Sequence, residues 1–270
     1  MLEESRSGRL AAWGNALFAG EVSPDEAVAR VVGPDAVHRV AGLPGEESEV
    51  GLSLALGRLR ARVPSGARDA GAAGLRVALP VPGHPLGLSG PPEFNARALE
   101  ACEAVLAPGA GVGLVPEVRT RGPAGDAHVS VRWECLPIRV APPADVPTLG
   151  EAERELTEAL RDATEALTRL DVAGSGPVAG AALAAYQARA EAGRELLAPG
   201  CPPRAVRVLE LAQRVAALVD IAREPEQGAA VSASQMAVRA ELLRPVERTA
   251  RRAQVAAYNA YAEELDRRRA

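Results

Sequence analysis

Lysine is absent from this chain of 270 residues, and all 31 basic side chains are arginine. The absence excludes a Schiff-base lysine, a catalytic ammonium group and the phosphate-binding lysine of a Walker-type loop. Together with abundant alanine, glycine and proline, the bias is typical of a high-GC bacterial genome, which explains it without selection for function. The formal net charge of −4 disfavours nucleic-acid binding through overall charge.

Aromatic residues and cysteines are also scarce. There are two tryptophans, three tyrosines and two phenylalanines, so the core must be built mostly from alanine, leucine and valine. The cysteines are odd in number, widely separated and without a Cys-x-x-Cys pair, which excludes a disulfide framework and a zinc cage. We expect all three to be small buried residues in a reducing compartment: Cys102, Cys135 and Cys201.

Histidines and cofactor motifs give no sign of a metal or nucleotide site. The histidines, His38, His84 and His128, are scattered, whereas metal ligands need short defined spacings. Residues 174–180, GSGPVAG, match the dinucleotide fingerprint in letters but follow a helical pattern instead of a strand. We therefore predict neither a metal nor a cofactor.

Long apolar segments are missing as well. No uninterrupted run approaches the roughly 18 residues that a membrane-spanning helix needs, and the first nine residues contain no apolar core segment. These patterns predict a cytoplasmic protein that does not enter the membrane.

Residues 75–106 contain the clearest change of pattern in the chain. Residues 75–81 alternate between apolar and other side chains, which predicts a strand, and the spacing from Asn95 to Leu106 predicts a helix with Asn95 as its N-cap. Further strands are predicted at 37–43, 112–119 and 128–135, the last two as a hairpin, so the sheet is mixed. Helices are predicted at 6–19 and 24–32, and from Val50 to Val63.

Residues 141–147, APPADVP, are the best candidate for a domain boundary, since three prolines in seven residues resist helix and central strand. Beyond it the pattern is helical, opening with a capping box at Thr148 and Glu151. Helices are expected at about 178–197, 203–223, 232–244 and 246–267, with Pro245 separating the last two or kinking one long helix. The predicted fold is α+β or α/β: a small mixed sheet with flanking helices over residues 1–146, followed by an all-helical domain over 147–270.

The thirteen-residue loop 82–94 is the first candidate site. Loops between strand and helix usually take about 2–6 residues, so one this long suggests a function. It leaves the carboxyl end of a strand and leads to a helix amino terminus, where free amides attract anions. Its candidate ligand-binding residues are His84, Ser89, Glu93 and Asn95. The alternative is a rigid proline-pinned connection that seals the edge of the sheet.

The second candidate is an arginine-rich stretch near the carboxyl terminus. Four arginines would lie near one face of a helix, with two tyrosines one or two turns later: Arg244, Arg248, Arg251, Arg252, Tyr258 and Tyr261. Arginine forks beside tyrosines can bind an acidic protein partner, phosphate or nucleic acid. The alternative is a solvated helix face with internal ion pairs.

These features predict a regulatory or protein-interaction protein without recognisable catalytic machinery, because nucleophile motifs, metal clusters and cofactor motifs in context are lacking. A protein partner is favoured over nucleic acid, since the chain as a whole is acidic. The alternative function is an enzyme or binding protein for a small anionic metabolite that uses loop 82–95.

Overall fold

The computed structural model describes residues 5–63, 74–123, 127–139, 144–169, 197–223 and 233–267. The chain forms two compact units. The helical unit comprises Met1–Glu3, Pro147–Leu196 and Pro203–Ala257. The sheet unit comprises Glu4–Val146, Leu197–Pro202 and Tyr258–Ala270, so it includes a short segment and the end of the chain in addition to the first half.

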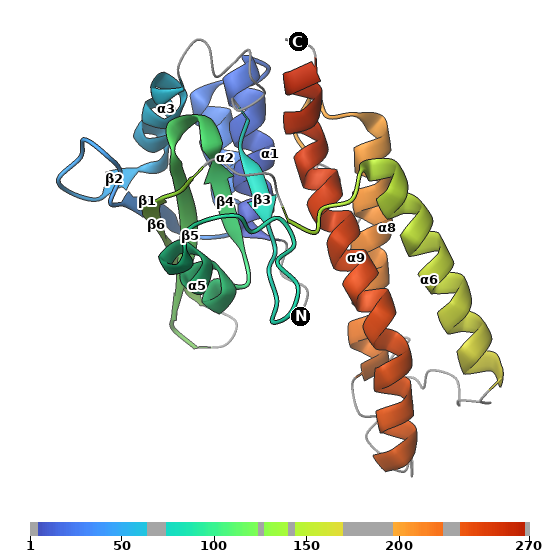
Figure 1. Ribbon diagram of the computed structural model, residues 1–270. Coiled ribbons are helices and arrows are strands. Elements are labelled where there is room, and N and C mark those ends of the chain that lie inside the picture. The colour runs from blue at the N-terminus through green and yellow to red at the C-terminus, as the bar shows by residue number, and fades with distance from the viewer. Residues whose placement is uncertain are drawn as a thin grey trace. The chain divides into compact units, whose positions relative to one another are not determined.

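The sheet unit contains six strands in the order β2-β1-β6-β5-β4-β3 (Figure 1). β1 and β6 are parallel, and every other neighbouring pair is antiparallel. The predicted mixed sheet is therefore confirmed. The strands are β1 (Val37–Ala41), β2 (Val50–Gly51), β3 (Arg76–Ala78), β4 (Ala104–Ala107), β5 (Val112–Arg121) and β6 (His128–Pro137).

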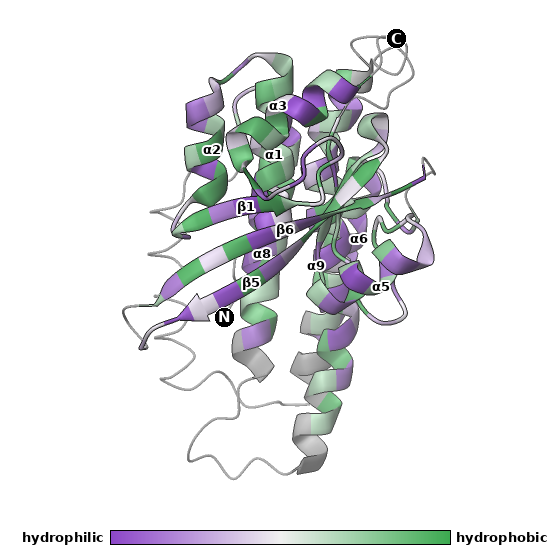
Figure 2. Cartoon of the chain, turned by 90° about the vertical axis from the view of Figure 1, so that its left-hand side faces the viewer, coloured by the Kyte–Doolittle hydropathy of each residue, from purple (hydrophilic) through white to green (hydrophobic). Residues whose placement is uncertain are grey.

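Alternation along β6 follows the predicted pattern, and Figure 2 shows hydrophobic and hydrophilic residues in turn along this strand. Val131, Trp133 and Cys135 are buried, while the residues between them are half-buried. The buried set therefore lies on one face of the sheet, and the intervening polar side chains lie on the other.

Helices pack on both faces of this sheet. They are α1 (Arg6–Ala19), α2 (Pro24–Val32), α3 (Leu52–Arg62) and α5 (Pro92–Ala101). α5 and the loop before it bury Phe94, Ala98 and Leu88 against Val115 and Leu106. α1 packs against β3, β4 and β5 and shares the face that carries Trp133. The flanking helices of the predicted fold are thus present.

Two helices begin at the capping residues that the sequence predicts. The Ser23 hydroxyl accepts a hydrogen bond from the Glu26 amide at 3.2 Å, and Pro24 is the first residue of α2. In the helical unit, the Thr148 amide donates to Glu151 Oε2 at 2.9 Å, and the Glu151 amide donates to Thr148 Oγ1 at 3.3 Å. This reciprocal pair is a complete capping box.

The described helices of the helical unit are α6 (Leu149–Arg169), α8 (Pro203–Arg223) and α9 (Ala233–Arg267). The predicted helical character of the carboxyl-terminal region is confirmed for the residues that the structure describes there. α9 runs through Pro245 without interruption, so of the two alternatives the structure has one long helix and not two helices separated there. The predicted helix at about 178–197 lies outside the described residues except at its last position. The GSGPVAG turn lies wholly outside them.

β4 was not predicted, and it changes the connection after β3. Val105 and Leu106 fit the helical spacing of the preceding segment, but α5 ends at Ala101 and Cys102 adopts a left-handed backbone with φ of 58°. The chain then returns as β4, antiparallel to both β3 and β5. β3 and β5 consequently run in the same direction with one strand between them.

Candidate functional site

α5 begins four residues earlier than predicted. Its N-cap is Pro91 and its first residue is Pro92. The Asn95 amide donates to the Pro91 carbonyl oxygen at 2.9 Å. Asn95 therefore lies within the first turn, and its predicted role as the N-cap is wrong. Proline fits the first helical position because its missing N–H would have had no intrahelical partner.

The loop before α5 folds back on itself. Val81 and His84 exchange both backbone hydrogen bonds, at 3.0 and 2.8 Å, and the Leu79 amide donates to the Leu86 carbonyl oxygen at 3.0 Å. Leu86 is fully buried and Leu88 is 6% exposed. Because β3 is the edge strand, these contacts support the interpretation that the loop seals the edge of the sheet.

The four candidate ligand-binding side chains do not converge. His84 and Ser89 are half-buried, Glu93 is exposed, and Asn95 is half-buried with an Oδ1 atom that has no hydrogen-bond partner. No hydrogen bond or ion pair joins any two of these side chains in the described part of the sequence. A pocket around them remains a prediction that the observed geometry does not favour.

The candidate arginines of α9 fall into two groups. Arg244 pairs with Glu241 on the same helix at 2.8 Å, and Arg252 pairs with Glu155 of α6 at 3.1 Å. Arg248 is exposed and Arg251 is half-buried. Neither of these two has an ion pair or hydrogen bond from its side chain to any residue that the structure describes.

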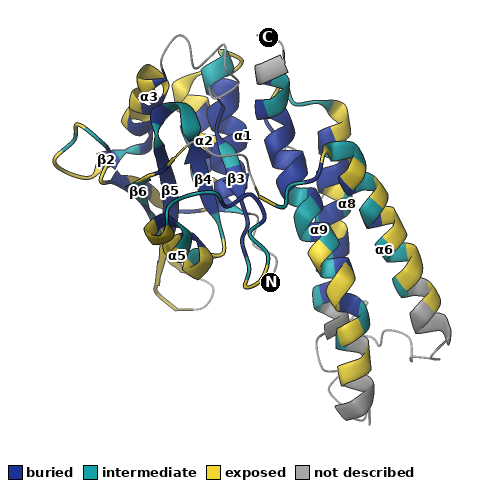
Figure 3. Cartoon of the chain, viewed as in Figure 1, coloured by how far each residue is buried: buried dark blue, intermediate teal, exposed yellow. Residues whose placement is uncertain are grey.

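The two candidate tyrosines are buried and not part of that face. Tyr258 is 2% exposed and Tyr261 is 1% exposed. Figure 3 shows α9 exposed along much of its length and buried toward its carboxyl end. A methyl group on Gly8 of α1 would overlap the ring of Tyr258, so the tyrosine packs directly on the α1 backbone. The tyrosines are core residues of the sheet unit, and their predicted place on a binding surface is wrong.

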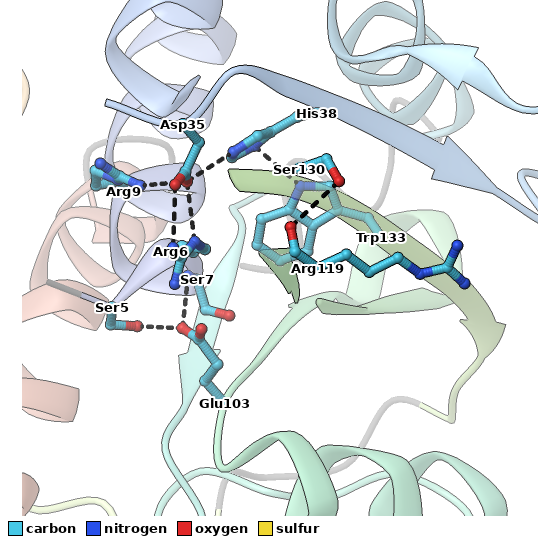
Figure 4. Close-up of polar contacts among 10 residues, drawn as sticks. All are labelled: Ser5, Arg6, Ser7, Arg9, Asp35, His38, Glu103, Arg119, Ser130 and Trp133. Atoms are coloured by element: carbon cyan, nitrogen blue, oxygen red, sulfur yellow. Dashed lines mark hydrogen bonds and ion pairs between the residues drawn. The ribbon is translucent and has the colours of Figure 1, made fainter. Parts of the chain in front are cut away.

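A buried polar cluster around Asp35 was not foreseen from the sequence (Figure 4). Asp35 lies between α2 and β1 and accepts two hydrogen bonds from Arg6, at 2.9 and 3.0 Å. It also accepts one from Arg9 at 3.1 Å and lies 3.1 Å from His38 Nε2. The side chains of Arg6, Asp35 and His38 are 7%, 3% and 0% exposed, so the cluster has almost no access to solvent.

Hydrogen bonding fixes the protonation of His38. The Trp133 indole N–H can only donate, and it lies 3.3 Å from His38 Nδ1. His38 Nδ1 is therefore the unprotonated nitrogen, and Nε2 carries the hydrogen and donates to Asp35. Burial lowers the pKa of His38, and the charges of Arg9 and Arg6 lower it further, against the opposing effect of Asp35.

Asp35 remains ionised in this setting. Burial by itself raises the pKa of a carboxyl group, but hydrogen bonds from Arg6 and His38 and the two arginine charges outweigh it and hold the pKa of Asp35 below its usual value. Since both nitrogens of His38 are engaged and its side chain is inaccessible, the cluster cannot exchange protons with a substrate. Its hydrogen bonds link α1 to β1 and β6, so its role is structural.

Glu103 closes the amino terminus of α1. Its Oε2 accepts from the Ser5 hydroxyl at 2.7 Å and from the Ser7 amide at 2.9 Å. A carboxylate here interacts favourably with the helix dipole and satisfies a free amide. The anion-attracting end of α1 is thus already occupied by a side chain of the protein.

Of the three cysteines predicted to be buried, Cys135 is buried, Cys201 is half-buried and Cys102 is exposed. Burial raises the pKa of Cys135 to about 11 and that of Cys201 to about 12, so neither thiol is an active nucleophile near neutral pH. Cys102 is exposed at the end of α5, which contradicts its predicted burial. Among the described residues, no group of three or more His, Cys, Asp or Glu side chains could hold a metal ion.

Within the described ranges, no helix has both the length and the apolar composition needed to cross a bilayer.

Comparison with known proteins identifies mycobacterial relatives. The chain is 32% identical over 280 residues to the uncharacterized protein Rv1486c of Mycobacterium tuberculosis H37Rv, covering 93% of this chain and 95% of the relative. It is 29% identical over 284 residues to the uncharacterized protein ML1804 of Mycobacterium leprae, with the same coverages. These relatives agree with the high-GC composition, and their names state no activity. No solved structure matches the chain.

Two family models match in succession along the sequence. The N-terminal domain model of Rv1486c-like proteins matches residues 7–147, and the C-terminal domain model matches residues 150–255. The chain therefore belongs to the Rv1486c-like protein family.

Proposed function

We propose that this protein is a cytoplasmic, non-enzymatic interaction protein that docks an acidic protein surface on exposed arginines of α9. The observation that supports the proposal is the unpaired state of Arg248 and Arg251 in the described part of the chain, although Arg244 and Arg252 beside them have carboxylate partners. The proposal assigns docking to the carboxyl-terminal domain, residues 147–270.

Helix geometry places the docking residues together. Arg244, Arg248 and Arg251 are separated by four and three residues, so they lie along one side of α9, and we call them the arginine stripe. Each unpaired guanidinium offers a planar fork of donors that suits a carboxylate. Arg252 is excluded from the stripe, since its side chain is 16% exposed and bound to Glu155.

Metabolite binding at loop 82–95 receives less support. Leu86 and Leu88 fill the inner side of this loop, and its polar side chains do not meet. A regulatory role fits a protein whose accessible chemistry consists of surface charges, and the three free cysteines fit a reducing compartment.

The test is cross-linking with a matched control. The full chain carries a photo-crosslinker at Gln254, and its partners are compared between the parent sequence, R248E/R251E and R207E/R214E. The last variant makes the same change in charge at two arginines of α8, both exposed. We expect R248E/R251E alone to lose acidic partners. Equal capture by both variants, each with the helical circular dichroism of the parent, would contradict the proposal.

A further inference from the structure

α6 carries a row of carboxylates that matches the arginine stripe in spacing. Its members are separated by four, three, four and three residues, so they lie along one side of the helix: Glu151, Glu155, Glu158, Asp162 and Glu165. We call this row the acidic stripe. Glu158 and Asp162 are exposed, and neither makes an ion pair with any residue that the structure describes.

The two stripes border the same seam of the helical unit. Arg252 Nε lies 3.1 Å from Glu155 Oε2, so a member of the acidic stripe joins α6 to α9 beside the arginine stripe. The helices run in opposite directions (Figure 1). Counting from this pair at about 1.5 Å per residue, Glu158 lies within about 1.5 Å of the level of Arg248, and Asp162 within about 1.5 Å of the level of Arg244.

Among the described residues, the ion pair of Arg252 with Glu155 crosses the seam beside the arginine stripe. Arg248, Glu158 and Asp162 make no ion pair there, and Arg244 holds only Glu241, in a pair whose side chains are 68% and 64% exposed. Glu158, Asp162 and Arg248 are therefore left without an ion pair to the described residues, side by side on one surface.

The direction of the two-fold axis determines which charges come into contact when such a surface binds a second copy of itself. A two-fold axis parallel to the rows places the acidic stripe of each copy on the arginine stripe of the other. An axis across the rows would place like charges on like, which is repulsive. Two-fold symmetry with self-complementary patches is the commonest form of protein dimer.

We propose that the acidic partner is a second copy of this chain, bound through reciprocal contacts of α6 and α9 about an axis parallel to these helices. The inference rests on the proposed function and names its partner. The register pairs Glu158 of one copy with Arg248 of the other, and Asp162 with Arg244, each twice. These side chains are exposed, so the dimer is weak and sensitive to salt.

The test is sedimentation velocity of the full chain over a range of concentrations at low and high ionic strength. We expect a concentration-dependent dimer at low salt that dissociates near 1 M salt, where the Debye length is about 3 Å. R244E/R248E and E158R/D162R should each weaken self-association by roughly tenfold or more, because each creates like-charge contacts. R207E/R214E should associate like the parent.

Mixing the two stripe variants gives the decisive measurement. R244E/R248E presents acids on both rows, and E158R/D162R presents arginines on both, so their equimolar mixture restores all reciprocal pairs and should form a heterodimer. R207E/R214E has the same net charge as R244E/R248E and should not restore binding. Dimers of the parent that persist in both stripe variants, or a mixture that stays monomeric, would overturn the inference.

The two proposals fail in different ways. A parent chain that is monomeric at every concentration and salt, yet cross-links an acidic protein through Arg248 and Arg251, removes the second copy as the partner and leaves the proposed function standing. A chain that shows neither behaviour removes both.

Discussion

Asn259 holds both backbone polar groups of Val77, although 182 residues separate them. Its Oδ1 accepts from the Val77 amide at 2.7 Å, and its Nδ2 donates to the Val77 carbonyl oxygen at 3.1 Å. Asn15 makes the same two contacts with Leu75, at 2.7 and 2.9 Å. Residues opposite each other in an antiparallel pair exchange two such bonds. The side-chain amides of Asn259 and Asn15 therefore lie where a seventh strand would pair with β3, the edge strand.

Replacing Asn259 with alanine should destabilise the sheet unit. The change leaves the amide and carbonyl of Val77 without partners in a buried place, since Asn259 is 1% exposed and Val77 is fully buried. At about 1–3 kcal/mol for a buried polar group left unsatisfied, we expect a loss of roughly 2–4 kcal/mol in unfolding free energy. Urea unfolding measures the loss.

Hydrogen exchange shows which backbone contact causes the loss of stability in Asn259→Ala. In Asn259→Ala the Val77 amide should lose protection while Leu75 stays protected by Asn15, and Asn15→Ala should reverse this pattern. Unchanged exchange at Val77 in Asn259→Ala would show that the amide contact does not hold the edge.

Two helical glycines should respond in opposite directions to alanine. A methyl group on Gly8 of α1 would overlap the Tyr258 ring, so Gly8→Ala should cost about 1–3 kcal/mol through overpacking. Gly57 of α3 has nothing within 4 Å of the added carbon, and Gly57→Ala should stabilise by about 0.5–1 kcal/mol. Thermal unfolding of the two variants beside the parent checks both signs, and a stabilised Gly8→Ala would mean that Tyr258 does not pack there.

Asp35→Asn should be among the most destabilising isosteric changes in the chain. It removes the only carboxylate bonded to the buried guanidinium of Arg9 among the described residues, and it weakens both contacts of Arg6. Breaking a buried pair by removing one charge typically costs about 3–5 kcal/mol. The control is Glu117→Gln, which removes an exposed carboxylate that also serves two arginines, Arg119 and Arg132. The control should change stability by about 1 kcal/mol or less, so comparable losses in the two variants would contradict the buried role of Asp35.

Acidification should reveal the neutral state of His38. Its pKa is lowered from 6.5 in the fold, first by burial, so below pH 6.5 the unfolded chain binds a proton that the folded chain does not. The unfolding free energy therefore falls as the pH falls from 6.5 toward the folded pKa, by at most about 1.4 kcal/mol per pH unit. Urea titrations at pH 7.5 and 5.5 measure this slope. His38→Gln should reduce it, and an identical slope in the variant would assign the dependence to other groups.

Asp35 affects a lower pH range. Its pKa is held below 3.8 in the fold, so its stabilising contribution is complete above that value and is lost as the pH falls through the folded pKa. Asp35→Asn should therefore lose part of the acid sensitivity of the parent below pH 4.

Local signals explain the part of the fold that the sequence predicted. The cap of α2 and the capping box at Thr148 and Glu151 each depend on residues three apart. The β5–β6 hairpin depends on a period of two over adjacent segments. Such interactions leave a pattern in a short window of sequence, and that pattern was sufficient to predict these helix starts and this hairpin.

The missed features depend on contacts between distant residues. Asp35 meets Arg6 and Arg9 across 29 and 26 positions, and Trp133 meets His38 across 95, so no local spacing marks the cluster. β4 was missed because the residue after α5, Cys102, has a left-handed backbone conformation that is usually adopted by glycine. Helical spacing placed the candidate docking residues on one helix, but it could not show that Arg252 pairs with Glu155 or that Tyr258 is a core residue.

Pro245 offers the last test, because α9 continues through it. A proline inside a helix removes one hydrogen bond and crowds the carbonyl one turn before it, at a cost of about 3 kcal/mol relative to alanine. Pro245→Ala should therefore raise the stability of the helical unit, by up to that amount. The experiment is thermal unfolding followed by circular dichroism at 222 nm, with Ala240→Pro on the same helix as the opposite change. Pro245 lies next to Arg244, and the variant leaves the charge of the arginine stripe unchanged. A Pro245→Ala variant less stable than the parent would mean that packing around the proline ring outweighs the missing hydrogen bond.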